Sequence, residues 1–536
     1  MEVPPAGDED FELNREPDCS YSLGELKASL DKTIFYQIPL STDGPPKPYP
    51  ERFVYNWSST ASSWVLSPSY SSLVIPSNSL PSDYVRMPFK VDNQSKHKLL
   101  GTSEWTKIVN LLTSSSILTT TNLISVIKDY NPGLIKESFS VLSTLLDECY
   151  TPSEREHFFS IILPKMIKLT VDLPKLIRQP IPILKQRSNH SLFFSQQQIS
   201  SLLCNGFFCT FPEHKQFKLQ DFSFSKLFSS PKDDRFNRKL EKLKCILNYL
   251  HRVVSEPPKG IVSFERRHLE ENEMVNWSSS SLKLSKVSVH LKGTIESHGY
   301  GMIQADFANK CVGGGVLRSG LVQEEIRFVI NPELMVSMLF TETLLENECL
   351  LITGTEQFNK YSGYGNTFLF DGNYYDPTQL DEWGRRYTKI VAMDAKSFPG
   401  NKVRDQYKRL FIDRELTKAY VAFMDRRKLD RKHLCAVATG NWGCGVFRGD
   451  PQLKSLIQLI AASLSGRDVM YFTFGDAKLS TDMSLIVNSL GQKKITTGQL
   501  YQFLIDYGDY VSSLDLDQEK EPLFDYVIRK FLTEST

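Results

Sequence analysis

The strongest constraint on the fold is a change of hydrophobic pattern at Pro257 and Pro258. Before this point, apolar residues recur with the period of amphipathic helices. After it, short runs rich in β-branched and aromatic residues alternate with helical segments. Strands that alternate with helices favour a layered α/β domain with a mainly parallel or mixed sheet. We therefore predict an α/β domain preceded by a helical one.

The helical block is expected over residues 96–255 and the α/β block over residues 256–536. Ser195 is the predicted N-cap of a helix in the first block, and Asp450 with Pro451 begins a predicted helix in the second. Strands are predicted within residues 286–293, 301–307, 348–354, 389–395, 434–440 and 468–475. Further helices are predicted at residues 404–425 and along the tail, residues 479–536.

The N-terminal region differs from both blocks. Residues 1–30 are polar and acidic, which is typical of disorder, and residues 31–95 are expected to form an extended lead-in with a Ser-rich insert at residues 58–82. The first residues lack the basic and apolar regions of a signal peptide. No apolar run approaches the roughly 20 residues that span a bilayer. We expect a soluble intracellular protein, in the nucleus, the cytoplasm or both, without membrane contact.

Charge and cysteine content exclude some classes of protein. A net charge of +1 argues against direct DNA binding through a broad basic face. Nine scattered cysteines without a CxxC predict neither a zinc site nor a disulfide framework, and their odd number fits a reducing compartment. The basic cluster at residues 426–432 is interpreted as a link from a helix to a strand, with a nuclear signal as the alternative. We see no coiled coil and expect a monomer.

The most unusual segment covers residues 304–328, where Gly313, Gly314 and Gly315 separate a predicted strand from a predicted helix. Glycine permits positive φ and lets a ligand approach the backbone closely. Ligands of open α/β sheets bind beyond the carboxyl ends of the strands, so this turn is a candidate diphosphate site. A flexible turn without a ligand is the alternative that the glycines alone leave open.

Gln323, Glu324 and Glu325 stand at the start of the next helix. Acidic residues are common there because they complement the helix dipole, so a structural role is the alternative. The apolar sequence that follows predicts a packed helix start, where a carboxyl group has a raised pKa and can act as a general acid. Neighbouring helical residues differ by about 100° in direction, so we expect one glutamate to donate the proton and the other to orient a sugar.

Other loops add candidates for ligand contact. A second glycine-rich loop, residues 438–447, follows a predicted strand and is placed to complete a phosphate cradle. The aromatic loop at residues 361–365 and Phe474 at the end of a strand are candidates for stacking on a base or ribose. Aromatic residues at strand ends are more often core residues, which is the alternative here.

These motifs resemble those of the poly(ADP-ribose) glycohydrolases. The glycine triplet, a short spacer and the sequence Gln-Glu-Glu match the family's motif, and residues 293–334 as a whole resemble the animal enzymes. The likeness covers roughly residues 34–534. Other similar segments are residues 351–358, 361–365, 415–420, 436–450, 453–462 and 471–476, and upstream residues 36–40, 84–89, 173–186, 195–212 and 240–254. Residues 58–82 and 365–379 depart from the family's pattern.

The resemblance implies a macrodomain with a mixed central sheet flanked by helices, preceded by an all-helical accessory domain. It implies exo-type hydrolysis of the ribose–ribose bonds of poly(ADP-ribose), carried on ADP-ribosylated proteins, with release of ADP-ribose. No metal or other cofactor is expected, because a ligand phosphate can stabilise the oxocarbenium-like charge. The long regulatory extension of some animal forms is missing, which weakens a nuclear assignment.

The resemblance also implies residue roles. Glu325 matches the acid that protonates the departing 2′-hydroxyl and then activates water, and Glu324 matches the residue that binds the ribose hydroxyls. Asp306 and Asn309 match residues that support the scissile ribose. The other implied substrate contacts are Gln323; Ile295 and Glu296 for adenine; Gly313, Gly314, Gly315, Asn441, Gly443 and Gly445 for diphosphate and ribose; Tyr364 as a closing aromatic; and Phe447 and Phe474 at the terminal ADP-ribose.

Two other functions are weighed against the hydrolase. A macrodomain that only binds ADP-ribose has the same fold, so the fold cannot separate a reader from an enzyme. The pair Glu324–Glu325 after the glycine turn does separate them, because a reader needs no buried acid. A helical scaffold with a vestigial macrodomain would require damaged ligand loops, whereas these loops look intact. The hydrolase is the favoured hypothesis.

Overall fold

The computed structural model describes most of both blocks and short parts of the lead-in. Its described residues are 13, 32–35, 55–58, 63–66, 84–89 and 103–533, except 115, 178–180, 213–217, 231–232, 382, 426–430, 432–433 and 516–517. The predictions for the N-terminal residues 1–30, for most of the lead-in with its Ser-rich insert, and for the basic cluster at residues 426–432 therefore lie largely outside the described residues.

The first block consists mainly of helices, as its periodicity predicts. In α2 the buried residues Trp105, Ile108 and Leu112 form the expected apolar stripe. Ser195 caps α8 as predicted, and its hydroxyl accepts from the backbone N–H of Gln198 at 3.0 Å. The α-helices of this block are α2 (Ser103–Ser114), α3 (Thr120–Tyr130), α4 (Ser140–Ser143), α5 (Pro152–His157), α6 (Leu163–Val171), α7 (Leu173–Leu176), α8 (Gln196–Phe207), α9 (Ser225–Phe228) and α10 (Asp234–Ser255).

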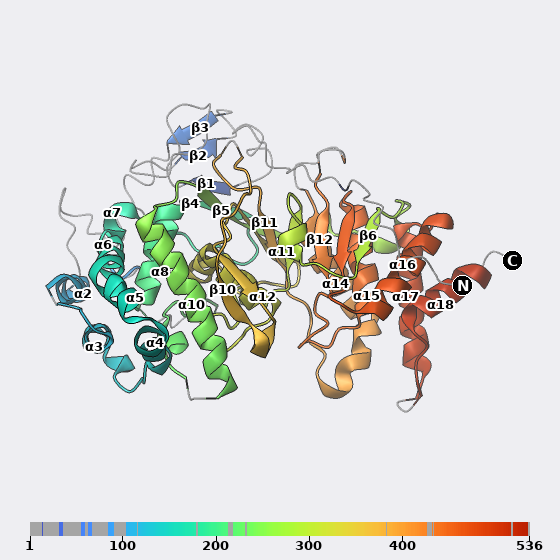
Figure 1. Ribbon diagram of the computed structural model, residues 1–536. Coiled ribbons are helices and arrows are strands. Elements are labelled where there is room, and N and C mark those ends of the chain that lie inside the picture. Colours follow the sequence, from blue (N-terminus) through green and yellow to red (C-terminus); the bar gives the residue numbers. More distant parts are fainter. Residues whose placement is uncertain are drawn as a thin grey trace.

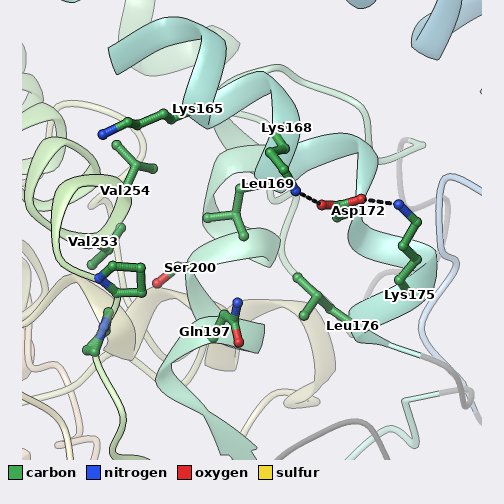
Figure 2. Close-up of a pocket in the computed structure, with 12 residues that line it drawn as sticks. Lys165, Lys168, Leu169, Asp172, Lys175, Leu176, Gln197, Ser200, Val253 and Val254 are labelled. Carbon is green, nitrogen blue, oxygen red and sulfur yellow. Dashed lines mark hydrogen bonds and ion pairs between the residues drawn. The ribbon is translucent and has the colours of Figure 1, made fainter. Parts of the chain in front are cut away.

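A pocket of about 380 Å³ lies within this helical block, between α6, α7, α8 and the end of α10 (Figure 2). Its apolar walls include Leu169, Leu176 and Val253. Two lysines at its rim are paired with Asp172, Lys168 at 2.7 Å and Lys175 at 2.5 Å. None of the predicted site residues lines it.

The largest sheet among the described residues has nine strands in the order β1-β4-β5-β8-β11-β7-β12-β13-β6. From β11 to β6 neighbouring strands are parallel, whereas β4, β5, β8 and β11 pair antiparallel. The strands are β1 (Lys32–Phe35), β4 (His190–Ser195), β5 (Ile261–His268), β6 (Val287–His290), β7 (Ile303–Asp306), β8 (Glu348–Thr353), β11 (Lys389–Ala392), β12 (Val437–Gly440) and β13 (Val469–Phe472). Small antiparallel pairs join β2 (Tyr55–Ser58) to β3 (Ser63–Leu66) and β9 (Asn359–Ser362) to β10 (Leu369–Asn373).

Each of the six predicted strands is present within its predicted range, whereas β4 and β5 were not predicted from the sequence. The helical block contributes β4, which pairs along its whole length with β5. Five of the six residues of β4 are buried without alternation, and such a run has no period that separates a strand from a helix. The helical block and the α/β block therefore share one sheet.

Two layers of helices cover the two faces of the sheet. One face packs on the helical block and α12, and the other on α14, α15 and α17. In Figure 1, the blue-green helices and the orange-red helices lie on opposite sides of the strands. The helices of the second block are α11 (Ile295–His298), α12 (Gln323–Ile330), α13 (Ser337–Phe340), α14 (Arg409–Phe423), α15 (Pro451–Leu464), α16 (Ala477–Gln492), α17 (Thr497–Ser513) and α18 (Leu523–Thr533).

Helix starts in the second block follow the predicted capping. The carboxylate of Asp450 accepts from the backbone N–H groups of Gln452 and Leu453, and Pro451 opens α15. The C-terminal residues form α16, α17 and α18, as expected for the tail. Within the described residues, no helix is both long enough and apolar enough to cross a membrane.

Candidate active site

The candidate site lies at the carboxyl edge of the parallel strands. Asp306 ends β7, Asn441 follows β12, Phe474 follows β13 and Ile295 follows β6. The pairing of β7 with β12 covers only two residue pairs and stops before the carboxyl ends, whereas β12 and β13 pair over four. Ligands of open α/β sheets bind beyond the carboxyl ends of the strands. The topology thus brings the predicted residues to one edge of the sheet.

Glu324 is fixed by the loop that leads from β7 into the glycine turn. The backbone N–H of Asn309 donates to Oε2 of Glu324 at 2.8 Å, and that of Gly313 donates to Oε1 at 2.6 Å. The residue is 3% exposed. Burial, with added repulsion from Asp306 and Glu325, raises the pKa of Glu324 well above its ordinary value. Burial therefore favours the protonated form of this carboxyl group, while the two backbone N–H groups act in the opposite direction.

Glu325 contacts the same turn from the next position of α12. Its Oε1 accepts from the backbone N–H of Gly315 at 2.8 Å, and its Oε2 accepts from that of Val322 at 2.9 Å. The Val322 contact also caps the helix, so Glu325 has a structural role as well. A Cβ on Gly314, where φ is +50°, would lie 2.5 Å from oxygens of both Glu324 and Glu325. Only glycine leaves room for the two carboxyl groups there.

Asp306 and Arg327 lie buried beside the glutamates. Neither carboxylate oxygen of Asp306 has a hydrogen-bond partner among the described residues, and the same holds for Nε and Nη1 of Arg327. Burial raises the pKa of Asp306 to about 8, with Arg327 acting against the rise and Glu325 adding to it. An acid without a partner at this depth keeps its hydrogen-bonding capacity available for a ligand.

Gln323 joins the start of α12 to the end of β7 and to the aromatic loop. Its side chain accepts from the backbone N–H of Phe307 at 2.8 Å and donates to the carbonyl of Ala305 at 3.2 Å. Its own backbone N–H donates to the hydroxyl of Tyr364 at 3.2 Å. The Tyr364 side chain is 57% exposed, so its ring covers the start of α12 at the protein surface.

The predicted adenine-binding residues lie next to the same aromatic loop. The hydroxyl of Tyr361 in β9 donates to Oε1 of Glu296 at 2.5 Å. Burial and the charge of Glu296 raise the pKa of Tyr361 far above its ordinary value. Ile295 is buried and packs with Met302, Ala438 and other residues of the sheet. Glu296 is therefore oriented by a partly buried phenol, while the side chain of Ile295 packs in the core.

Two residues of the second glycine loop, Trp442 and Asn441, anchor it to neighbouring elements. The indole N–H of Trp442 donates to the carbonyl of Met393 at 2.9 Å, and its side chain is fully buried. The side-chain oxygen of Asn441 accepts from the hydroxyl of Tyr471 at 3.0 Å. The ammonium of Lys454 packs against the ring of Trp442, 4.1 Å from its centroid. It also forms an ion pair with Glu415.

The rest of this loop has a mixed environment. Gly443 has φ +73°, and a Cβ there would meet that of Ala395 at 2.5 Å. No heavy atom lies within 4 Å of a Cβ built on Gly445, so this position faces open space. Phe447 is partly buried against the core, whereas Phe474 has φ +53° and a side chain that is 45% exposed. Among these, Gly445 and Phe474 are the most accessible to a ligand.

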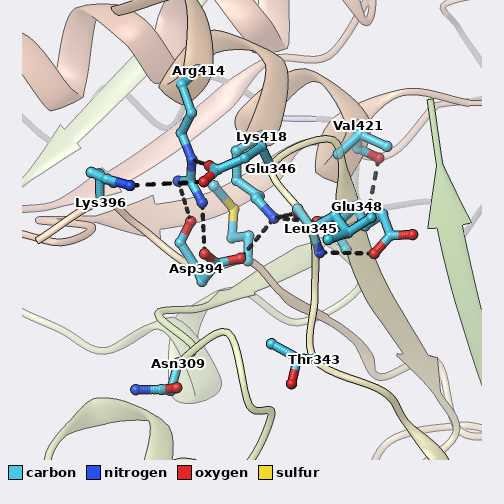
Figure 3. Close-up of polar contacts among 12 residues, drawn as sticks. Asn309, Thr343, Leu345, Glu346, Glu348, Asp394, Lys396, Arg414, Lys418 and Val421 are labelled. Atoms are coloured by element: carbon cyan, nitrogen blue, oxygen red, sulfur yellow. Dashed lines mark hydrogen bonds and ion pairs between the residues drawn. The ribbon is translucent and has the colours of Figure 1, made fainter. Parts of the chain in front are cut away.

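A network of charged residues links the end of β11 to α14 (Figure 3). This network was not predicted from the sequence. Asp394 follows the end of β11 and pairs with Arg414 and Lys418, each at 2.6 Å. Arg414 also pairs with Glu346, whose side chain is 60% exposed. The network joins α14 to the end of β11, next to the strand that carries Asp306.

Comparison with known proteins gives the family. The family model described as poly(ADP-ribose) glycohydrolase, macro domain fold, matches residues 274–481, and that of the family's helical domain matches residues 150–266. A probable poly(ADP-ribose) glycohydrolase 2 of Arabidopsis thaliana is 33% identical over 422 residues, which cover 67% of this chain and 80% of the relative. The chain belongs to the poly(ADP-ribose) glycohydrolase family.

Other relatives extend this result. Poly(ADP-ribose) glycohydrolase 1 of Arabidopsis thaliana is 32% identical over 444 residues, covering 68% of this chain and 80% of the relative. Poly(ADP-ribose) glycohydrolase 1 of Caenorhabditis elegans is 33% identical over 329 residues, covering 59% of this chain and 40% of the relative. Membership of the family confirms the predicted fold class, a helical domain followed by a macrodomain.

Three polar residues near the candidate site were not predicted from the sequence: Gln220, Lys242 and Arg327. Gln220 donates to the carbonyls of Cys311 and Val312. Lys242 is fully buried. The sequence does indicate this burial, because Lys242 falls on the apolar stripe of α10, four residues before Ile246. Nothing in the local sequence of Gln220 indicates its contact with the glycine turn.

Proposed function

We propose that this chain hydrolyses the O-glycosidic ribose–ribose bonds of poly(ADP-ribose) and releases ADP-ribose, with Glu325 as general acid and base. The observation that supports this most strongly is the position of Glu325, 6% exposed and held by two backbone N–H groups beside the glycine turn. The substrate and the reaction agree with the names of the relatives from Arabidopsis thaliana and Caenorhabditis elegans.

One carboxyl group serves both halves of the reaction. Glu325 protonates the 2′-oxygen of the departing ribose while its bond to the anomeric carbon breaks, and positive, oxocarbenium-like charge develops on that carbon. The carboxylate then takes a proton from the water that attacks the same carbon, which restores the acid. The diphosphate of the ligand, lying against the glycine turns, stabilises the positive charge electrostatically.

Glu324 and Asp306 hold the ribose. The pKa of Glu324 is raised well above its ordinary value by burial, and burial raises the pKa of Asp306 to about 8, so burial favours the protonated form of each. A protonated carboxyl group both donates and accepts hydrogen bonds, which suits a pair of sugar hydroxyls. Such neutral acids beside Glu325 avoid the cost of three buried negative charges.

The remaining contacts and the wider setting are part of the same proposal. Asn309 and Gln323 support the scissile ribose, Glu296 and Ile295 contact adenine, and Tyr364 closes over the ligand. The diphosphate and the terminal ADP-ribose contact Gly313, Gly314, Gly315, Asn441, Gly443, Gly445, Phe447 and Phe474. Residues 96–255 act as the accessory domain and residues 256–536 as the catalytic domain. The chain acts as a monomer on ADP-ribosylated proteins in the nucleus, the cytoplasm or both.

The Glu325→Gln variant tests the role of the acid. We expect release of ADP-ribose from labelled polymer to fall by at least about 10²–10⁴-fold, because the amide of glutamine cannot transfer the proton. The dissociation constant for ADP-ribose should stay within about threefold, since the amide keeps the shape of the side chain. Wild-type turnover in this variant would refute the assignment of Glu325.

The unmodified chain tests the reaction itself. Incubation with labelled polymer, followed by separation of the products, should give free ADP-ribose. Intact polymer, together with measurable binding of ADP-ribose, would instead identify a reader. The Glu346→Gln variant serves as a control, because this carboxylate is 60% exposed and belongs to the network behind the strands.

A further inference from the structure

Lys242 is a buried cation whose contacts all lead to the glycine turn. It stands in the middle of α10, in the helical block, and its side chain has no exposed surface. Its ammonium lies within hydrogen-bond distance of four backbone carbonyls: Gly315 at 3.2 Å, Val316 at 2.8 Å, Arg318 at 2.7 Å and Gly320 at 2.6 Å. An ammonium has three N–H donors, so the four carbonyls share them.

These contacts account for the burial of the charge. An isolated buried ammonium is strongly unfavourable, and backbone carbonyls are the groups that replace its lost water. Residues 315–320 therefore curl around a cation that comes from a different block of the molecule. The shape of this loop, from here called the carbonyl loop, depends on a residue that the loop itself does not contain.

The position of the carbonyl loop fixes the carboxyl group of Glu325. At one end of the loop, the N–H of Gly315 donates to Oε1 of Glu325. At the other end, a Cβ on Gly320 would lie 2.6 Å from that same oxygen. The carboxyl group is thus packed against both ends of the loop. Displacement of the loop by one ångström would move or release the group that transfers the proton.

The charges of Lys242 and Glu325 also interact. Burial lowers the pKa of Lys242 to about 7, and the charge of Glu325 acts against this fall. The neighbouring Lys239 and Arg238 lower the pKa further by repulsion. Among these groups, only Glu325 favours the charged form of Lys242.

We propose that Lys242 is a positioning residue for the hydrolysis, through which the helical block holds the carbonyl loop and the carboxyl group of Glu325 in place. Gln220, also in the helical block, holds the preceding carbonyls of Cys311 and Val312 at 2.9 and 2.8 Å. The glycine turn is therefore attached to the helical block on both sides. This inference rests on the proposed role of Glu325, since Lys242 acts through that residue and does not touch the substrate.

The test compares two lysines of α10. In Lys242→Met the side chain keeps an unbranched apolar stem but loses the terminal ammonium, with its donors and charge. We expect kcat for polymer hydrolysis to fall by about 10–100-fold, the scale expected when a reacting group is misplaced by about one ångström. KM for the polymer and the dissociation constant for ADP-ribose should change by less than about threefold, because the second glycine loop and the aromatic residues are untouched.

Lys239→Met is the matched control. Lys239 lies one turn earlier on α10 and also donates to backbone carbonyls, those of Lys226 at 2.6 Å and Ser229 at 2.7 Å, but these belong to the helical block. We expect its kcat to stay within about twofold of wild type, since no contact with the carbonyl loop is lost. Thermal unfolding of both variants shows whether their stabilities are comparable.

Each outcome decides the inference. A wild-type kcat in Lys242→Met, or a change confined to KM, overturns it, because either shows that the cation does not position the acid. If Lys242→Met does not fold, Lys242→Gln is measured instead. Its side chain is one bond shorter and has two donors in place of three, so it cannot hold all four carbonyls, and we expect kcat to fall here too. A wild-type kcat in that variant also overturns the inference. Intact polymer after incubation with the unmodified chain would instead refute the proposed function, and full turnover in Glu325→Gln would refute the role of Glu325 on which the inference rests.

Discussion

Asp306 and Asp394 stand at or just beyond the ends of two neighbouring parallel strands, yet their environments are opposite. Both are buried. Asp306 has no hydrogen-bond partner for its carboxylate among the described residues, and burial raises its pKa to about 8. Burial alone would also raise the pKa of Asp394, but Lys418 and Arg414 hold it below its ordinary value. The same residue type at the same edge of the sheet is an acid in one place and an anion in the other.

The comparison shows that the charge of a buried carboxyl group depends on its ion-pair partners and not on its burial alone. Asp394 is committed to an ion pair that joins α14 to the sheet, so it has little capacity left for a ligand. Asp306 has no such ion-pair partner in the described part of the chain and lies fully buried near Glu324 and Glu325. A buried group left without a partner costs stability, which is the pattern expected where selection acts on binding and not on folding.

The largest expected effect comes from breaking the paired aspartate. Asp394→Asn leaves Arg414 and Lys418 with an uncompensated buried charge, so we expect the free energy of unfolding to fall by about 3–5 kcal/mol. Urea denaturation followed by fluorescence measures this change. Glu415 and Glu346 also pair with Arg414. A loss below about 1 kcal/mol would show that these two carboxylates compensate, and the contrast with Asp306 would not hold.

The second prediction concerns Asp306→Asn and depends on pH. Because folding raises the pKa of Asp306 from 3.8 to about 8, the folded protein keeps a proton that the unfolded chain loses above about pH 4. The contribution of this residue to stability is therefore full below pH 4 and falls, by about 1.4 kcal/mol per pH unit, until pH 8. Asparagine does not titrate, so the variant should gain stability relative to wild type as pH rises.

Thermal midpoints at pH 5 and pH 8 check this second prediction. We expect the difference, variant minus wild type, to be more positive at pH 8. Asp394 should show the opposite sign: its lowered pKa means that its stabilisation is present above about pH 4 and is lost on acidification. An Asp306→Asn variant whose difference from wild type is the same at both pH values would contradict the raised pKa.

The smallest effect is expected at the exposed end of the same network. Glu346 pairs with Arg414 but is 60% exposed, so Glu346→Gln should change the free energy of unfolding by no more than about 1 kcal/mol. The same urea titration that is used for Asp394→Asn measures it. A loss as large as that of the buried aspartate would mean that exposure does not weaken this ion pair.

Local signals predicted the elements that carry the site. The glycine triplet, the acidic residues after it and the apolar helix start are contiguous, and the structure has β7, a turn and α12 there. The angle between neighbouring helical residues suggested that Glu324 and Glu325 diverge. Both nevertheless contact the turn at Gly314, because the turn curls across the N-terminus of α12. The directions in which the two side chains leave the helix do not reveal the path of the glycine turn.

Long-range contacts could not be predicted in this way. The strand β4 pairs with β5, about seventy residues later, and neither run shows a clear period. Lys242 reaches residues 315–320, and only its place on an apolar stripe marked it as unusual. The roles of the site residues came from the family resemblance, since composition and periodicity do not distinguish an acid that binds ribose from one that caps a helix.

The sheet shared by the two blocks limits how the protein can be shortened. A fragment that began at residue 274 would lack both β4 and β5 and would leave β8 as an edge strand. All six residues of β8 are buried in the intact chain, so such an edge would be apolar and its backbone groups unpaired. Edges of this kind recruit other chains and aggregate. We therefore expect the macrodomain of this protein to aggregate when it is expressed alone, and expression trials should keep the preceding helical residues.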